Sequence, residues 1–406
     1  MPSNPPDGDP APEDGSLPSS AVAGLGARPF GAYVHVPFCA TRCGYCDFNT
    51  YTALELGGGA SQAAYADSVA LEVGLARRAL GGADLPLHTV FFGGGTPTLL
   101  PPGDLARILR ILRETFGLAD DAEVTTEANP DSVDASGLER LRAAGFTRIS
   151  YGMQSAVPHV LATLERTHDP DRVPLAVGWA RAAGFEDVSL DLIYGTPGES
   201  LEDWQTSVDA VVSMNPDHVS AYALVVEEGT KLAARVRRGE VAGTGEDDLA
   251  DKYVVADEAL TKAGYHWYEV SNWSRHADNR SRHNLGYWRG HDWWGFGPGA
   301  HSHVGGTRWW NLRHPVAWAS KLQSGQSPTQ AREVLSDAER YEERVLLEVR
   351  LAEGLPLDVL TPRERENVRT LIHEGLVHAD TLTTGTLTLT LRGRLLADHV
   401  VRRLLP

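Results

Sequence analysis

Short apolar or β-branched runs alternate along the chain, from Phe30 onward, with longer segments in which apolar side chains recur at helical spacing. The runs that predict strands are 33–36, 88–92, 123–127, 148–151, 188–193 and 219–224. The segments that predict helices are 61–80, 103–116, 134–144, 170–183 and 201–213. Gly117, Gly145 and Gly184 follow three of these segments, as glycine commonly does where a helix ends. Strands separated by helices predict parallel βα units, which fit both an open doubly wound sheet and a barrel.

The positions of polar residues and glycines favour the barrel. In an α/β barrel the carboxyl ends of the strands meet at one mouth, where the ligand-binding groups gather. The groups within or just after the successive strands are the cysteine run, Gly93–Thr96, Glu127, Gln154, Asp191 and Tyr222. We therefore expect an α/β fold with a partial (βα)6 barrel, similar to a TIM barrel, whose mouth carries the site.

Changes in composition divide the chain into four parts. Residues 1–28 are rich in Pro, Asp, Gly, Ser and Ala with few large apolar groups, which predicts a disordered tail. The barrel takes residues 29–265, including a further helix near 246–263, and a separate functional segment dense in Trp, His and Gly takes 266–330. Residues 331–406 predict a small α+β, winged-helix-like domain. Its expected elements are helices at 337–350, 362–374 and 393–404 and a Thr-rich hairpin at 381–391.

Charge and hydropathy exclude some classes of protein. The 406 residues include 54 acidic and 37 basic side chains, a net charge of −17, which opposes binding to nucleic acid. Several arginines near the C-terminus alternate with leucines at core spacing, so they do not change that expectation. No apolar run reaches the ~18 residues of a transmembrane helix, and the first residues lack a signal-peptide pattern. We expect a cytoplasmic protein with no transmembrane segment.

The cysteines are the strongest chemical signal in the sequence. All three, Cys39, Cys43 and Cys46, lie within eight residues, a distribution that excludes a disulfide framework. Three thiolates on one short loop suit an iron–sulfur cluster, whose fourth iron would take a residue from elsewhere or a small molecule. A zinc site completed by a histidine such as His35 is the alternative.

The cysteine run, with Tyr45 before its last cysteine, resembles the signature of the radical S-adenosylmethionine (SAM) superfamily. Further matching segments follow in the same order, namely YVHVPF at 33–38, FGGGTP at 92–97, EANP at 127–130, GMQS at 152–155 and DLIYG at 191–195. From about Phe30 to the C-terminus, the chain resembles the branch that contains oxygen-independent coproporphyrinogen oxidases and haem chaperones. The resemblance implies a radical SAM barrel that holds a [4Fe–4S] cluster on the three cysteines, with SAM chelating the open iron.

The resemblance also implies the residues of the SAM site. The positions that would hold the SAM methionine and ribose are Glu127, Gln154, Arg166 and Asp191; Gly93, Gly94, Gly95 and Thr96 would lie beside its amino group, and Tyr33 by the cluster. The chemistry agrees, because a carboxylate accepts hydrogen bonds from ribose hydroxyls and a guanidinium pairs with a carboxylate. Glycines let backbone approach a ligand closely.

Two features separate the members of this branch. Phe48 stands where the resembled oxidases have one more cysteine. The residues His283, Asn284, Tyr287 and Trp288 form an HNxxYW motif, which in the resembled chaperones is associated with haem binding. Imidazole is an axial ligand of haem iron, and aromatic side chains offer flat apolar surface to the macrocycle. His291, His301 and His303 are further candidate ligands.

Both features favour a haem chaperone. The resemblance then implies three partners: haem as cargo, a haem-accepting protein of the respiratory chain, and an electron donor for the cluster. SAM would serve either as a switch or as a radical source. Oxygen-independent coproporphyrinogen III oxidation is the rival function, and a zinc-bound α/β protein without radical chemistry is the third alternative.

Overall fold

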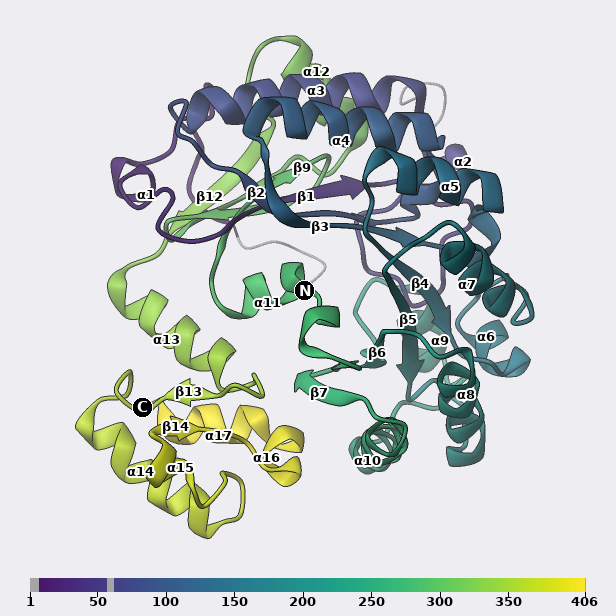
Figure 1. The fold of residues 1–406 in the computed structure, drawn as a ribbon, viewed down its shortest axis with the longest axis vertical. Coiled ribbons are helices and arrows are strands. Elements are labelled where there is room, and N and C mark those ends of the chain that lie inside the picture. Colours follow the sequence, from purple (N-terminus) through teal and green to yellow (C-terminus); the bar gives the residue numbers. More distant parts are fainter. Residues whose placement is uncertain (1–6, 57–61, 406) are drawn as a thin grey trace.

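The computed structural model describes residues 7–56 and 62–405, and its centre is one curved sheet (Figure 1). The strand order is β12-β11-β10-β9-β1-β2-β3-β4-β5-β6-β8-β7. Strands β1 to β6 pair in parallel in chain order, which confirms the predicted βα units. Their bounds are β1 Phe30–Val36, β2 Leu87–Gly94, β3 Leu118–Ala128, β4 Arg148–Gln154, β5 Asp187–Tyr194 and β6 His218–Ala223.

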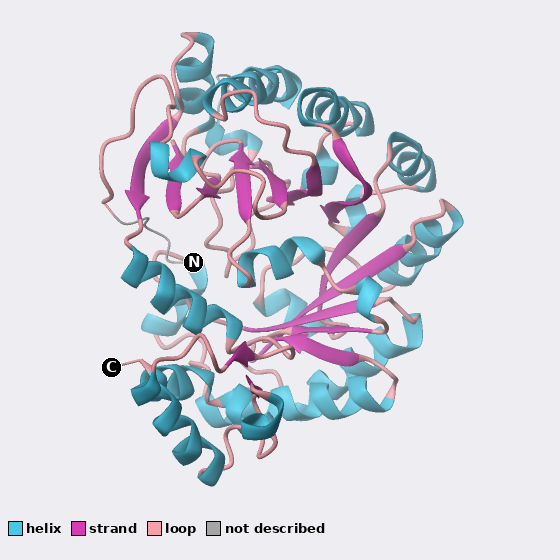
Figure 2. Cartoon of the chain, turned by 60° about the vertical axis from the view of Figure 1, so that its left-hand side comes forward, coloured by secondary structure: helices cyan, strands magenta, loops and turns pink. Residues whose placement is uncertain are grey.

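Helices cover the outer face of this sheet (Figure 2). Helix α4 shows why, because Leu105, Ile108 and Leu112 recur along one side of it and are all fully buried. The helices of the barrel region are α2 Ala53–Leu56, α3 Gln62–Ala79, α4 Pro102–Phe116, α5 Ala135–Ala144, α6 Pro158–Thr163, α7 Arg172–Ala182, α8 Leu201–Met214, α9 Lys231–Arg237 and α10 Glu246–Lys262. The predicted helices are confirmed, except that residue 61 lies outside the described residues. No helix in the described part of the chain has the length and apolar character needed to cross a bilayer.

The Trp- and His-rich segment 266–330 is not a separate unit, contrary to our expectation. Its first strands, β7 (His266–Glu269) and β8 (Asn272–Ser274), extend the sheet beyond β6. Helix α11 (Arg282–Trp288) then leads to the opposite edge (Figure 1). There β9 (Asp292–Phe296) pairs with β1, and the sheet continues through β10 His301–Val304, β11 Thr307–Asn311 and β12 Thr329–Val334, with α12 Pro315–Gln323 between the last two. The tryptophans of this segment are largely core residues of the sheet, which explains the unusual composition.

The predicted disordered tail is also wrong for residues 7–28, while residues 1–6 lie outside the described residues. Asp9 forms an isolated antiparallel bridge with Arg332 on β12, and Ser327 donates its backbone N–H to the Glu13 carbonyl. The short helix α1 (Ser19–Val22) buries Ala21 completely. The segment is ordered by pairing with a distant strand, which its polar, proline-rich composition does not reveal.

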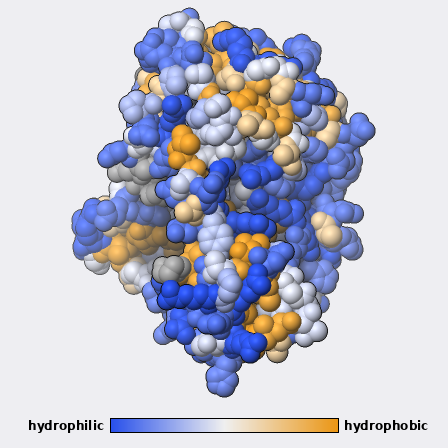
Figure 3. Space-filling view, turned by 90° about the vertical axis from the view of Figure 1, so that its left-hand side faces the viewer, coloured by the Kyte–Doolittle hydropathy of each residue, from blue (hydrophilic) through white to orange (hydrophobic). Residues whose placement is uncertain are grey.

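The C-terminal region has its own apolar core, made of residues such as Val345, Leu371 and Val400. Its elements are α13 Asp337–Glu348, β13 Leu355–Pro356, α14 Pro362–His373, α15 Thr381–Thr384, β14 Thr386–Leu387, α16 Leu391–Leu395 and α17 Ala397–Leu404. The Thr-rich run is not a hairpin, because β14 pairs with β13 and α15 precedes it. The last predicted helix is interrupted at Leu396, whose φ of −116° is not helical. Hydrophilic side chains cover most of the face in Figure 3, interrupted by separate hydrophobic patches.

Candidate functional site

The three cysteines lie on the loop that follows β1, and all three thiols are free and half-buried. The loop folds back on itself, since the Cys39 N–H donates to the Tyr51 carbonyl (3.0 Å) and the Tyr51 N–H donates to the Pro37 carbonyl (2.7 Å). Burial raises the pKa of the Cys46 thiol to about 11 and also raises that of Cys39. Thiolates here therefore need a nearby positive centre, and a bound metal group would supply one.

The polar side chain of Asn49 fixes the far end of this loop. Its Nδ2 donates to the carbonyls of Pro298 (2.9 Å) and Arg313 (2.8 Å), and its Oδ1 accepts from the Tyr51 hydroxyl (3.1 Å). Its backbone carbonyl lies 2.9 Å from Nε2 of His35. Asn49 thus ties the cysteine loop to the strands added beside β1, a role that the sequence did not signal.

The glycine loop after β2 packs directly against the cysteine loop. The N–H groups of Gly95 and Thr96 donate to the carbonyls of Val36 and Phe38, each at 2.8 Å. A Cβ atom on Gly95 would lie 2.5 Å from the Phe38 carbonyl oxygen and 3.0 Å from the Cys39 sulfur. Only glycine fits at this position, so the loop and the first cysteine are built as one unit.

Arg166 reaches the second cysteine from the loop after α6. Its Nη1 lies 3.8 Å from the Cys43 sulfur, and its Nη2 donates to the Gly152 carbonyl at 2.6 Å. Its Nε is buried without a partner among the described residues. A guanidinium with a buried, unused donor beside a cysteine is suited to bind an anionic ligand group.

Two acidic side chains, Glu127 from β3 and Asp191 from β5, face the same mouth. The Gly94 N–H donates to Oε2 of Glu127 at 3.1 Å, while burial and the charge of Asp191 raise the pKa of Glu127 to about 8. Asp191 accepts the Ser150 hydroxyl (2.9 Å), and burial raises its pKa. Gln154, at the end of β4, has a φ of 64°, a strained value for a residue other than glycine. Two half-buried carboxyl groups at one mouth favour a ligand that carries positive charge.

Close contacts therefore join the glycine loop and Arg166 to the cysteines, and the glycine loop to Glu127. Tyr33, predicted to lie by the cluster, stacks on Phe91 and His283. The structure adds three residues that the sequence analysis did not assign. Tyr45 is buried close enough to Arg166, Cys43 and Asp191 for their charges to influence its pKa, which burial raises. The Thr50 hydroxyl is buried near Cys39 without a hydrogen-bond partner among the described residues, and the Ser150 hydroxyl donates to Asp191 at 3.0 Å. Ser150 lies two positions from Arg148 on β4, so strand periodicity could have placed it on the inner face.

The surroundings of the cysteines distinguish an iron–sulfur cluster from a zinc ion completed by His35. His35 is not directed at the cysteines, because Nδ1 faces the Tyr33 hydroxyl (3.0 Å) and Nε2 faces the Asn49 carbonyl (2.9 Å). Among the described residues, no three His, Cys, Asp or Glu side chains gather as one metal ion requires. A cubane attaches each thiolate to a different iron, so its ligands need not converge on one point. The loop fits a cluster and lacks the histidine that we considered for zinc.

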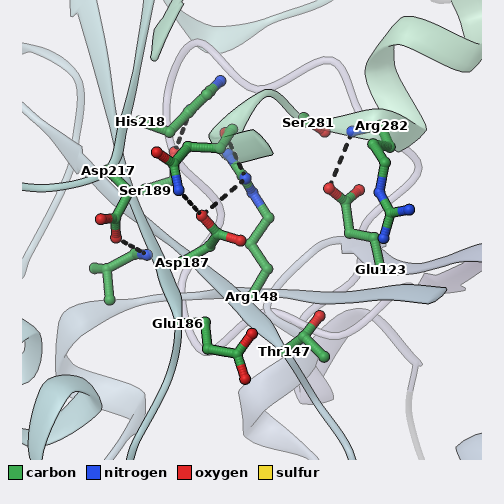
Figure 4. Close-up of polar contacts among 12 residues, drawn as sticks. Glu123, Thr147, Arg148, Glu186, Asp187, Ser189, Asp217, His218, Ser281 and Arg282 are labelled. Atoms are coloured by element: carbon green, nitrogen blue, oxygen red, sulfur yellow. Dashed lines mark hydrogen bonds and ion pairs between the residues drawn. The ribbon is translucent and has the colours of Figure 1, made fainter. Parts of the chain in front are cut away.

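Helix α11, which carries the HNxxYW motif, lies at the amino-terminal end of the barrel, away from the cysteines. The Arg282 N–H donates to Oε2 of Glu123 at 3.0 Å (Figure 4). The His283 N–H donates to Oε1 of the same side chain, also at 3.0 Å. Arg148, which is 2% exposed, donates to the Asn279 carbonyl just before the helix (2.8 Å). Charged side chains on the barrel strands thus hold this helix in place.

His283 is buried in the barrel wall with both ring nitrogens engaged. Nδ1 lies 2.8 Å from the Thr89 hydroxyl and Nε2 lies 2.8 Å from the Tyr287 hydroxyl, while the ring stacks on Phe91 at 5.1 Å. Burial lowers the pKa of His283 to about 3. Ligation of a metal by His283 would require the loss of one of these hydrogen bonds.

The rest of the motif and the other candidate histidines are spread over several environments. Trp288 packs against Tyr268, Leu285 and Leu351, while Asn284 is half-buried. His301 stacks on Trp310, and Nδ1 of His303 lies 2.9 Å from the His291 carbonyl oxygen. The structure brings His283 and Tyr287 together but does not gather the motif around one open cavity.

The barrel and its cysteine, glycine and carboxylate groups define a radical SAM protein. Residues 33–211 match the Radical SAM superfamily, and the structure of coproporphyrinogen III oxidase (HemN) from Escherichia coli has the same fold, with a TM-score of 0.80, 23% identity and coverage of 95% of this chain and 92% of that chain. Within the superfamily, the chain belongs to the HemW family. It is 53% identical to "Heme chaperone HemW" of Mycobacterium tuberculosis over 95% of this chain and 97% of the relative. The corresponding protein of Bacillus subtilis is 31% identical over 91% of this chain and 97% of its own length.

Proposed function

We propose that the protein is a haem chaperone, which binds haem and transfers it to a haem-accepting protein of the respiratory chain. The observation that carries this proposal is the 53% identity, over nearly the whole chain, with a protein named as a haem chaperone. We further propose that the protein acts in the cytoplasm and receives electrons for its cluster from a separate donor.

In this proposal, Cys39, Cys43 and Cys46 hold a [4Fe–4S] cluster. When bound, the cluster with SAM on its open iron supplies one-electron chemistry or a ligand-dependent switch. Arg166, beside Cys43, is placed to bind the SAM carboxylate, and its buried Nε supports this role. The remaining SAM residues in the proposal are Tyr33, Gly93, Gly94, Gly95, Thr96, Glu127, Gln154 and Asp191.

Oxygen-independent coproporphyrinogen III oxidation is the second candidate, favoured by the fold shared with the Escherichia coli enzyme. Phe48 argues against it, because this side chain is 58% exposed beside the cysteine loop where the oxidases of this branch have a further cysteine. The two functions differ in what happens to the tetrapyrrole: a chaperone releases haem unchanged, whereas the oxidase decarboxylates its substrate.

A transfer experiment separates the two functions. The cluster-reconstituted protein, loaded with haem under anaerobic conditions, is mixed with a haem-free b-type cytochrome, and the cytochrome spectrum is followed. We expect faster formation of the holo-cytochrome than from haem bound to albumin. A parallel assay with coproporphyrinogen III and SAM should give no product. Turnover of coproporphyrinogen without haem transfer would make the protein an oxidase.

The cluster has its own test. Anaerobic reconstitution should give about four iron and four sulfide per chain, and Cys43→Ala should lose most of both, because a cubane needs its thiolate ligands. Leu54→Ser is the matched control, since Leu54 lies near the same loop and is 96% exposed. One zinc per chain without sulfide would contradict the proposal.

A further inference from the structure

A small cavity of about 20 Å³ lies at the amino-terminal end of the barrel, far along the strands from the cysteine loop. The first residues of β1, β2 and β9 form its walls together with α11. His88, His283 and His291 all line it. A pocket that encloses a drug-sized ligand needs roughly 300 Å³ or more. A flat macrocycle would therefore lie across the opening, or mouth, of this cavity, at the opposite end of the barrel from the cysteines, and would not enter it.

The three histidines differ in what they can offer at this mouth. His283 is 4% exposed, and both of its nitrogens face hydroxyl groups. The imidazoles of His88 and His291 are half-buried, and within the described part of the chain neither forms a hydrogen bond. A ligand reaching the mouth therefore meets free imidazoles before it meets His283.

His291 is the better placed of the two. Its ring lies against Gly286 of α11, where an added Cβ atom would be in ordinary van der Waals contact with Nδ1 at 3.4 Å. Burial and the positive charges of Arg289 and Arg28 lower the pKa of His291 to about 4. The ring is neutral at pH 7, which is the form that ligates iron.

An arginine without a carboxylate partner stands beside His291. Arg28 is exposed and donates to the Gly290 carbonyl at 3.2 Å, and it forms no ion pair with any described residue. Arg282 and Arg289, in contrast, already pair with carboxylates. A guanidinium of this kind is suited to a carboxylate on a ligand.

The other groups at the mouth are mainly apolar. Pro29 and Trp293 line it, and the Trp293 ring packs against the rings of Tyr287 (4.6 Å) and His303 (5.1 Å). Asp292 also lines it, but its carboxylate accepts the Gly305 N–H at 2.9 Å and lies 3.8 Å from His303. This end of the barrel thus combines an imidazole without a hydrogen-bond partner, a guanidinium without a carboxylate partner and apolar side chains, which matches a metalloporphyrin that carries propionates.

We propose that haem docks across this mouth, with His291 as an axial ligand of the iron and Arg28 bound to a propionate. His283 then acts as a positioning residue, which fixes α11 through Thr89 and Tyr287. The inference rests on the proposed haem-chaperone function and assigns its cargo site to residues outside the HNxxYW motif.

Haem titrations of the full-length protein test this site by absorbance in the Soret region and by electron paramagnetic resonance. We expect the wild type to bind about one haem with a histidine-ligated spectrum, and His291→Ala to lose that spectrum with at least tenfold weaker binding. His291→Met should retain a ligated iron but with the changed spectrum of a thioether. His159→Ala, which removes an exposed histidine of α6 outside this cavity, is the matched control and should bind as the wild type does.

The propionate contact is tested separately. Arg28→Gln should weaken haem binding about two- to fivefold, the range expected of an exposed ion pair, and should leave binding of haem dimethyl ester unchanged. A wild-type spectrum in His291→Ala, or its loss in His159→Ala, would overturn the site while leaving the chaperone function standing. A wild-type chain that binds no haem would overturn both.

Discussion

Glu127 experiences two opposing influences within the barrel mouth. The Gly94 N–H favours its charged form, but burial and Asp191 disfavour it more and raise its pKa from about 4.5 to about 8. In the folded protein without a ligand, the side chain therefore tends to keep a proton near neutral pH. A cationic group bound beside it would reverse this preference and release that proton.

This shift makes stability depend on pH. Because the folded pKa is above the unfolded one, the contribution of Glu127 is fully present below pH 4.5 and is lost as the pH rises through 8. We expect the free energy of unfolding of the wild type to fall over this range by at most about 1.4 kcal/mol per pH unit from this group, and the melting temperature to fall with it. In Glu127→Gln that slope should shrink, and the variant should be the more stable chain at pH 8.

Thermal denaturation at a series of pH values checks this prediction. Glu228→Gln is the control, since Glu228 is an exposed carboxylate. An unchanged pH dependence in Glu127→Gln would show that Glu127 titrates near its ordinary value.

At the residue scale, the sequence predicted the groups whose chemistry is rare and missed those whose role depends on distant neighbours. Three clustered cysteines have few alternative meanings, so Cys39, Cys43 and Cys46 were found directly. Asn49 is an ordinary amide in the sequence, and its partners Pro298 and Arg313 lie some 250 residues away. Only the folded chain shows that it positions the cysteine loop.

Helix α3 is attached to the added strands through one buried side chain, Glu72. Its carboxylate accepts hydrogen bonds from the Gly297 N–H (2.8 Å), Asn311 Nδ2 (2.6 Å) and Trp318 Nε1 (3.0 Å). Gly297 begins the turn whose Pro298 carbonyl receives Asn49. The helix, the turn and the cysteine loop therefore form one connected support.

Replacing Glu72 with Gln should weaken this support. The glutamine NH₂ group would face the N–H donors that now bond to the carboxylate. At least one of these buried donors would lose its acceptor, which lowers the free energy of unfolding by about 1–3 kcal/mol. We expect a lower melting temperature and faster hydrogen exchange in the cysteine loop. Glu114→Gln on the exposed side of α4 should change neither. If both variants behaved like the wild type, the Glu72 contacts would not contribute to stability.

At the element scale, periodicity located the six barrel strands because each buries a local apolar run. It could not show that residues 266–330 supply strands to both edges of the sheet. That arrangement depends on pairing partners such as β1 and β6, which precede the segment by about 50 to 260 residues. The aromatic composition was read as a sign of function, whereas much of it forms the sheet core.

The C-terminal region docks on the barrel region through charged contacts as well as apolar ones. Arg394 donates to both oxygens of Asp257 on α10 (2.9 and 2.7 Å) and lies over the Trp267 ring at 4.5 Å. Glu353 accepts hydrogen bonds from Arg280 and Arg289, which flank α11. The region is therefore placed to stabilise the position of α11.

Removing Arg394 should loosen this docking. Arg394→Gln would leave Asp257 unpaired in a mostly buried site, at a cost of about 3 kcal/mol. We expect a separate, earlier unfolding transition and faster proteolysis within residues 331–406. Arg402→Gln, an exposed change in the same region, is the control. A single unshifted transition in Arg394→Gln would show that apolar contacts alone hold the regions together.

The two outer strands of the sheet are each covered by a distant part of the chain. On β12, Asp9 and Arg332 exchange backbone hydrogen bonds, and on β7 the Tyr268 carbonyl accepts the Ala352 N–H at 2.9 Å. An uncovered edge strand offers its free backbone groups to any other extended chain, and this is a common route to aggregation. The segments around Asp9 and Ala352 thus occupy backbone groups on the two edge strands. This contact hinders the addition of a strand from another molecule to the sheet.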